Sequence, residues 1–164
     1  MTTVEYRSRY DATPEALFAF HERPGALEAL TPPWERVRVV SREGRGIEAG
    51  ARVVIESRVG PAWLRWTAVH TRYIAGVEFV DRAESGPFRS WEHLHRVEAD
   101  PAGGAWLIDR VEYELPLDAL ARLLVGRWVR AKLDRMFAWR HQATARELGC
   151  RVLSGLGRAP ALEG

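Results

Sequence analysis

The sequence has a single cysteine, Cys150, among its 164 residues. One thiol forms neither an internal disulfide nor a multi-cysteine metal site. The chain also lacks a run of about 18 apolar residues, which is the length that a membrane-spanning helix needs. The first residues, Met1 to Tyr6, read as the start of a strand and contain no apolar segment of a secretory signal. We therefore expect a cytoplasmic protein without integral membrane association.

Two sequence patterns of catalytic loops are missing as well. The glycines Gly44, Gly46 and Gly50 lack the lysine and the strand–helix setting of a phosphate-binding loop. No serine lies in a nucleophile-elbow motif.

The net charge is +2 and the isoelectric point is about 9.0, because arginine greatly outnumbers lysine. Charge alone is weak support for nucleic-acid binding, so we expect neither a nucleic-acid partner nor a cofactor.

What the chain does contain is ordinary for one soluble globular domain, apart from its aromatic residues. Its length is enough to bury roughly two-thirds of the unfolded surface. Seven tryptophans are many for 164 residues. Large aromatic side chains bury much area each, and several on extended segments indicate a cavity wall or a thick core.

The stretch from Gly86 to Val97 predicts the strand around which the rest of the chain is organised. After a Gly-Pro turn, alternate side chains point to one face of this strand: Trp91, His93, His95 and Val97. Residues 100–104 have a turn composition, and a second extended run continues to Pro116. A turn centred on residue 101 or 102 places four pairs opposite one another: His95 with Asp109, Val97 with Leu107, His93 with Val111 and Trp91 with Tyr113.

The segment before this hairpin predicts one strand, two short helices and further strands. Residues 4–10 alternate, and Thr13 before Pro14 is a favourable helix start. Pro32 and Pro33 must end the second short helix. Further strands are expected at residues 34–42, 51–59, 63–74 and 77–83.

From residue 118 to residue 148 the apolar spacing becomes helical. One side of this helix is apolar, whereas His141 falls on the opposite side; the apolar members are Ala121, Val125, Trp128, Val129, Leu133, Met136 and Phe137. An antiparallel sheet leaves a face to be covered, and this helix is the element long enough to cover it. We predict an α+β domain over 1–148, with about seven strands in a curved antiparallel sheet around the helix. Residues 149–164 are expected to be a flexible C-terminal tail.

Several motifs resemble a known family: Thr31-Pro-Pro-Trp34, the Gly-Pro-Phe-x-x-Trp-x-His-x-His run of residues 86–95, Asp109-x-Val-x-Tyr-x-x-Pro116, and Leu133-x-x-Met136-Phe137-x-x-Arg140. Together with the order of elements, they look like the START-like, SRPBCC superfamily over residues 1 to about 148. More specifically, they are similar to a bacterial subfamily of ligand-binding SRPBCC proteins. The resemblance implies a helix-grip fold and a hydrophobic pocket. It does not imply a substrate, because the superfamily includes lipid binders, hormone binders, cyclases and chaperone-like modules.

The predicted hairpin mixes apolar side chains with imidazoles, an indole, a carboxylate and a phenol on one face. That mixture is typical of a lined pocket more than of a dry core. We expect the ligand-binding residues to be Trp66, Phe88, Trp91, His93, His95, Asp109, Val111, Tyr113, Leu133, Met136 and Arg140.

His93 and His95 share a strand face, as histidines of metal sites on sheets do. Asp109 and the more distant His70 are candidates for a third ligand, but the set is incomplete and we expect no metal. One alternative is that both histidines are hydrogen-bonded pocket or core residues. Another is a His–Asp pair, in which the carboxylate fixes the tautomer and raises the imidazole pKa. Such a pair can act as a general base, but no nucleophile accompanies it, so we assign no catalytic residue.

Arg140 has two interpretations: it forms an ion pair with Asp109 or Glu112, or it is an anchor for the acidic head of a ligand.

We expect the protein, as a monomer or weak dimer, to bind a small hydrophobic or amphipathic molecule between sheet and helix. One alternative is a cyclase- or dehydratase-like enzyme that uses a His–Asp pair in the same cavity. Another is a module whose open groove receives a partner protein.

Overall fold

The computed structural model describes residues 1–116 and 119–156, with side chains at all of these positions except 119–124. The strands are β1 (Thr2–Tyr10), β2 (Val37–Glu43), β3 (Arg52–Val59), β4 (Ala62–Ile74), β5 (Glu78–Ser85), β6 (Ser90–Ala99), β7 (Ala105–Glu114) and β8 (Val152–Gly155). The helices are α1 (Pro14–Glu22), α2 (Ala26–Ala29) and α3 (Ala119–Leu148).

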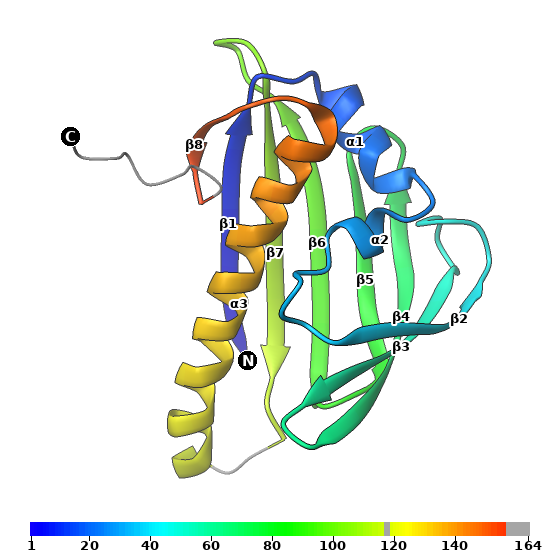
Figure 1. The fold of residues 1–164 in the computed structure, drawn as a ribbon, viewed down its shortest axis with the longest axis vertical. Coiled ribbons are helices and arrows are strands. Elements are labelled where there is room, and N and C mark those ends of the chain that lie inside the picture. The colour runs from blue at the N-terminus through cyan, green and yellow to red at the C-terminus, as the bar shows by residue number, and fades with distance from the viewer. Residues whose placement is uncertain (117–118, 157–164) are drawn as a thin grey trace.

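The strands of this described part form one curved antiparallel sheet of eight strands, in the order β2-β3-β4-β5-β6-β7-β1-β8. The long helix α3 lies across one face of the sheet, and α1 and α2 lie beside its C-terminal end (Figure 1). The predicted α+β class is therefore confirmed, with one strand more than expected.

The hairpin of β6 and β7 has the predicted register. His95 pairs with Asp109 and Trp91 with Tyr113, and the two other predicted pairs are also formed. The turn between these strands is closed by a hydrogen bond from the backbone N–H of Asp100 to the carbonyl oxygen of Gly104 (3.0 Å). Gly104 has φ +84°, and a Cβ atom there would lie 2.1 Å from the carbonyl oxygen of Tyr10. Only glycine fits this turn without strain.

Helix α3 is continuous through Gly126 and covers the sheet as predicted. The expected start at residue 118 lies outside the described residues. Val129, Leu133 and Phe137 are buried in one cluster with side chains of β1 and β7. The ring of Phe137 stacks on that of Tyr6, with 4.4 Å between the ring centroids. These contacts fix the distance between the helix and one half of the sheet.

The short helix α1 begins as its sequence predicts. The hydroxyl of Thr13 accepts a hydrogen bond from the backbone N–H of Ala16 (3.2 Å), and Pro14 occupies the first helical position. Leu17 and Phe18 of this helix are buried in a second cluster, with side chains of β5, β6, β7 and the end of α3. Helix α1 therefore anchors one end of α3 to the sheet.

The eighth strand corrects the expectation of a flexible tail from residue 149. Strand β8 pairs with β1, and Ser8 lies opposite Gly155. The backbone N–H of Leu156 extends this pairing to the carbonyl oxygen of Arg7 (3.2 Å). The free edge of β1 offers unpaired backbone groups, which a short segment without apolar periodicity can satisfy. Residues 157–164 lie outside the described part of the chain.

None of the helices that the structure describes combines the length and apolar character needed to cross a membrane.

Candidate functional site

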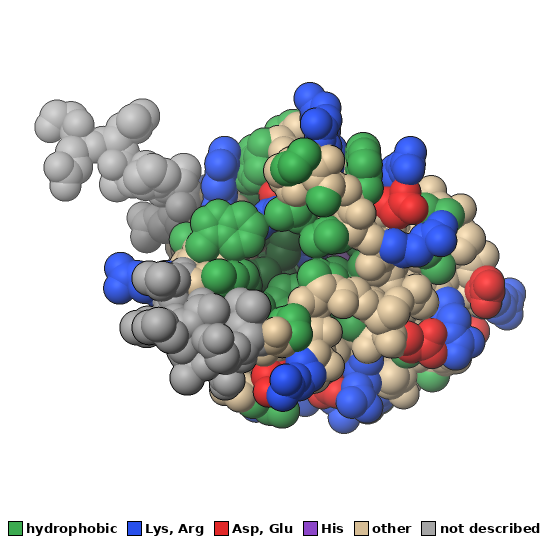
Figure 2. Space-filling view, turned by 90° about the horizontal axis from the view of Figure 1, so that it is seen from below, with side chains coloured by type: hydrophobic (Ala, Val, Ile, Leu, Met, Phe, Trp, Pro, Cys, Tyr) green, Lys and Arg blue, Asp and Glu red, His purple; other side chains and the backbone are tan. Residues whose placement is uncertain are grey.

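A cavity of about 800 Å³ lies between the sheet and α3. Its wall is formed by one side of α3, by strands β2 to β6, and by residues 21–32 around α1 and α2. The face of the molecule seen in Figure 2 is hollowed and bordered by hydrophobic side chains. Val125 and Trp128 of α3 line the cavity and are 38% and 55% exposed, so apolar side chains lie at its mouth. The volume is in the upper part of the usual range for small-molecule sites.

One end of the cavity is aromatic. Trp66 of β4, Phe88 just before β6, and Trp91 of β6 contact one another, with ring centroids 5.0 Å to 5.6 Å apart. The indole nitrogen of Trp91 is buried and has no hydrogen-bond partner among the described residues. This wall provides apolar area and one unused donor for a bound molecule.

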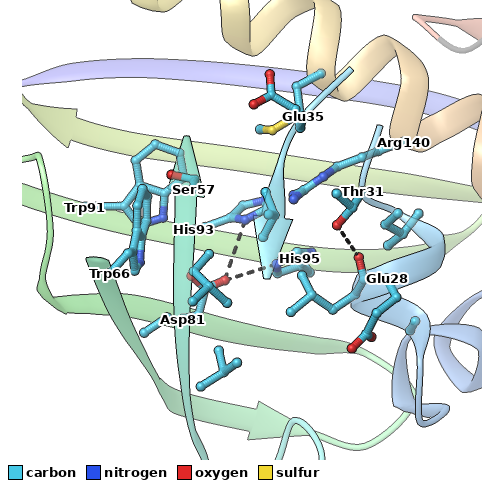
Figure 3. Close-up of a pocket in the computed structure, with 18 of the residues that line it drawn as sticks. Glu28, Thr31, Glu35, Ser57, Trp66, Asp81, Trp91, His93, His95 and Arg140 are labelled. Atoms are coloured by element: carbon cyan, nitrogen blue, oxygen red, sulfur yellow. Dashed lines mark hydrogen bonds and ion pairs between the residues drawn. The ribbon is translucent and has the colours of Figure 1, made fainter. Parts of the chain in front are cut away.

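The other end of the cavity is polar: His93 and His95 lie beside Asp81 there (Figure 3), and Asp109 lies behind the two histidines. Nε2 of His93 donates a hydrogen bond to Oδ1 of Asp109 (2.9 Å), and Nε2 of His95 donates one to Oδ2 of Asp81 (3.1 Å). Nδ1 of His95 also lies 2.9 Å from Oδ1 of Asp109, but it is out of line for a hydrogen bond. Nδ1 of His93 lies 3.5 Å from Oδ2 of Asp81. Both imidazoles therefore bridge β5 and β7.

Asp109 is fixed in position by a hydrogen bond from His141 of α3. Nε2 of His141 donates to Oδ2 of Asp109 (2.8 Å), and Nδ1 of His141 accepts from the hydroxyl of Ser8 (2.6 Å). Asp109, His141 and Ser8 are all buried. This chain of hydrogen bonds fixes the carboxylate and, through it, the ring of His93.

The polar cluster perturbs the pKa of both carboxylates, Asp81 and Asp109, and of both cavity histidines, His93 and His95. Burial disfavours the ionised carboxyl of Asp109, but the contacts with His141, His93 and His95 outweigh it and hold its pKa well below the usual range. The pKa of Asp81 is lowered in the same way, since its contacts with His95 and His93 outweigh burial. Burial lowers the pKa of His93, and the neighbouring His95 adds to this effect. For His95, burial is outweighed by Asp109 and Asp81, which raise its pKa.

Arg140 of α3 lines the cavity beside this cluster (Figure 3). Its Nε is buried without a hydrogen-bond partner, and the side chain forms no ion pair within the described part of the chain. Burial therefore lowers the pKa of this guanidinium, although Asp109 attracts it at longer range. The two carboxylates proposed as its partners contact other groups: Asp109 contacts histidines, and Glu112 pairs with Arg110 (2.6 Å).

Eight of the eleven residues predicted to bind a ligand line this cavity: Trp66, Phe88, Trp91, His93, His95, Leu133, Met136 and Arg140. Asp109 lies behind the two histidines instead. Val111 and Tyr113 share the predicted face but are buried in the core, because Val129, Leu133 and Phe137 of α3 fill the space above them.

Two polar residues of the site were not predicted. Asp81 lies in a segment predicted as a strand, and the alternation of Phe79, Asp81 and Ala83 is the signal that could have placed it on the inner face. His141 was placed on the exposed side of the long helix, which is wrong, since it is fully buried. Its position four residues after Phe137 puts both side chains on the same helix face.

The family of the chain is shown by comparison with known proteins. Residues 10–138 match the model of the family described as polyketide cyclase / dehydrase and lipid transport. The chain belongs to this family, which agrees with the SRPBCC resemblance of its motifs. No curated protein sequence matches the chain significantly.

Solved structures share the fold at low sequence identity. The aromatase/cyclase Zhui from Streptomyces sp. R1128 is similar with a TM-score of 0.68 and 16% identity, over 90% of this chain and 93% of that one. TTHA0849 from Thermus thermophilus gives a TM-score of 0.66 and 18% identity, over 89% and 99%. Ara h 8.0201 gives 0.63 and 18%, over 90% and 97%. At these identities the likeness is one of fold.

Proposed function

We propose that the protein binds a small molecule with an apolar body and an acidic head in the cavity between the sheet and α3. The observation that carries this proposal is Arg140, whose guanidinium lies in the cavity wall with no ion-pair partner among the described residues. A buried charge without a partner costs free energy, so a bound anion that satisfies it gains affinity.

The apolar body of the ligand would lie along the aromatic end of the cavity. Trp66, Phe88 and Trp91 offer ring faces and edges there, and Leu133 and Met136 of α3 line the opposite side. Burial of apolar area contributes about 25 cal/mol per Å², so the body supplies affinity and the head sets orientation. The family description, which includes lipid transport, agrees with carriage of such a molecule.

The test is titration of matched ligands against intrinsic tryptophan fluorescence. A medium-chain fatty acid and an aromatic carboxylic acid are each compared with the alcohol of the same skeleton. We expect the acids to bind at least about tenfold more tightly, because a hydrogen bond to a charged group contributes about 1.5–3 kcal/mol. In an Arg140→Gln variant this preference should disappear, while the alcohols bind as before.

Lys132→Gln is the matched control. Lys132 also lines the cavity as a cation, but it already pairs with Glu35 (3.1 Å). Its removal should leave the preference for acids unchanged. If neither acids nor alcohols bind at micromolar concentration, or Arg140→Gln keeps the preference, the proposal fails. In the first case a groove for a partner protein becomes the better explanation.

A second candidate function, enolisation of a ketone as in cyclase chemistry, is favoured by the pairing of His93 with Asp109. The carboxylate accepts from Nε2 of His93, which leaves Nδ1 as the basic nitrogen, and burial keeps this ring neutral. Acetophenone in D₂O is a simple probe, because a base exchanges its methyl protons for deuterium. Exchange catalysed by the protein and lost in His93→Gln would support this candidate, and exchange at the rate of buffer alone would exclude it.

A further inference from the structure

We propose that Asp81, His93 and His95 form a binding site for one divalent transition-metal ion at the polar end of the cavity. One oxygen and two nitrogens converge there: Oδ2 of Asp81 lies 3.1 Å from Nε2 of His95 and 3.5 Å from Nδ1 of His93. One potential ligand atom from each residue lies within 4.8 Å of the others. This inference does not depend on the proposed carrier function.

The spacing of these atoms fits a coordination sphere. Bonds from zinc to imidazole nitrogen or carboxylate oxygen are about 2.0–2.2 Å long, so neighbouring ligands of a tetrahedral or octahedral ion lie about 3–3.5 Å apart. The two distances from Asp81 fall in this range. The third separation, between the two imidazole nitrogens, lies within 4.8 Å, so an ion can contact all three atoms after adjustment of the side chains.

The far nitrogens of both histidines face a second carboxylate. Nε2 of His93 and Nδ1 of His95 each lie 2.9 Å from Oδ1 of Asp109, the first in a hydrogen bond. Histidines that bind metal ions commonly donate their other N–H to a carboxylate, which fixes the tautomer and makes the free nitrogen a better ligand. Asp109 is itself fixed by His141, so the support of the site is rigid.

The sequence argument for the absence of metal rested on the lack of a third ligand, and Asp81 of β5 supplies it. All three residues line the cavity, so an ion can enter and has coordination positions left that face the cavity. Two imidazoles, one carboxylate and open positions are the ligand set of many Zn²⁺ and Fe²⁺ sites. The charges agree as well, because the carboxylates of Asp81 and Asp109 lie near Arg140 without forming an ion pair with it, so negative charge is left for a cation.

The experiment starts from chelator-treated protein without any organic ligand. ZnCl₂ is titrated by calorimetry, and CoCl₂ by visible absorption, which reports nitrogen ligation. We expect one ion per chain. Asp81→Asn should weaken binding at least about tenfold, and Asp109→Asn about 10–100-fold as a supporting residue. Glu35→Gln, which removes a cavity carboxylate outside the cluster, should bind like the parent.

Circular dichroism and thermal melting of the metal-free variants show whether each one folds. A further measurement avoids substitution altogether: in wild-type protein with ¹⁵N-labelled histidine, zinc should change the ring-nitrogen signals of His93 and His95 more strongly than those of His21 and His70. The proposal is overturned if Zn²⁺ and Co²⁺ do not bind at micromolar concentration. It is equally overturned if the folded Asp81→Asn variant binds like the parent, or if zinc leaves the ring-nitrogen signals of His93 and His95 unchanged.

Discussion

Replacing Arg140 with methionine should stabilise the ligand-free protein, although most substitutions in a protein interior destabilise. Nε of Arg140 is buried without a hydrogen-bond partner among the described residues. An unsatisfied buried polar group costs about 1–3 kcal/mol, which methionine removes while it keeps most of the side-chain volume. Two losses oppose this gain: the contact of the guanidinium with the ring of Phe137 (5.5 Å), and its attraction to Asp109 and Asp81.

The direction in which the pKa of Arg140 is shifted decides between these effects. Burial lowers this pKa below its ordinary value, so the cost of burial outweighs the attraction of the nearby carboxylates. The cation–π contact contributes about 0.5–1 kcal/mol. We therefore expect a net gain of about 1 kcal/mol in the free energy of unfolding, which raises the melting temperature by about 2–4 °C for a domain of this size.

The measurement is urea unfolding of Arg140→Met and parent protein, followed by circular dichroism and repeated with saturating fatty acid. A ligand at 100 times its dissociation constant adds about 2.7 kcal/mol to the parent, and much less should be added to the variant. Lys132→Met serves as the control, since it removes a paired cation from the same cavity. If Arg140→Met lowers the stability of the ligand-free protein, the guanidinium has a stabilising partner within the protein and is not left unpaired for a ligand.

Three further predictions concern the fold. The pKa of His21 is lowered from 6.5 to about 4 by burial, so the unfolded chain binds the extra proton and stability should fall by about 3 kcal/mol between pH 7 and pH 4. Urea unfolding across this range should show a smaller loss in His21→Gln, and equal losses would contradict the assignment. Leu133→Asp should cost about 4 kcal/mol or more by placing an unpaired charge in the core, and a small shift of the melting temperature would show that α3 packs elsewhere. Gly104→Ala should destabilise by several kcal/mol, on the order of other strained backbone positions, because its Cβ would overlap the carbonyl group of Tyr10; unchanged thermal melting would refute this close approach.

The sequence by itself determined the hairpin at the centre of the sheet. Alternation has a period of two residues, so the face of Trp91, His93 and His95 follows once the turn at 100–104 is located. The same turn fixed which residue of β7 lies opposite each of them, and the pairing of His95 with Asp109 was predicted correctly. Local spacing likewise determined the buried side of α3, because Val129, Leu133 and Phe137 recur every four residues in a segment without an interrupting proline.

Only the tertiary structure decided how residues from separate elements combine into a site. Asp81 reaches the histidines because β5 pairs with β6, and His141 reaches Asp109 because α3 crosses β7; no local pattern encodes either meeting. The cavity depends on the separation between α3 and the sheet, which the packing of Tyr6 against Phe137 sets. Where large side chains fill that separation, as above Val111 and Tyr113, a core results, and where they do not, a cavity remains. Periodicity tells which way a side chain points, but the space it meets there depends on every element packed around it.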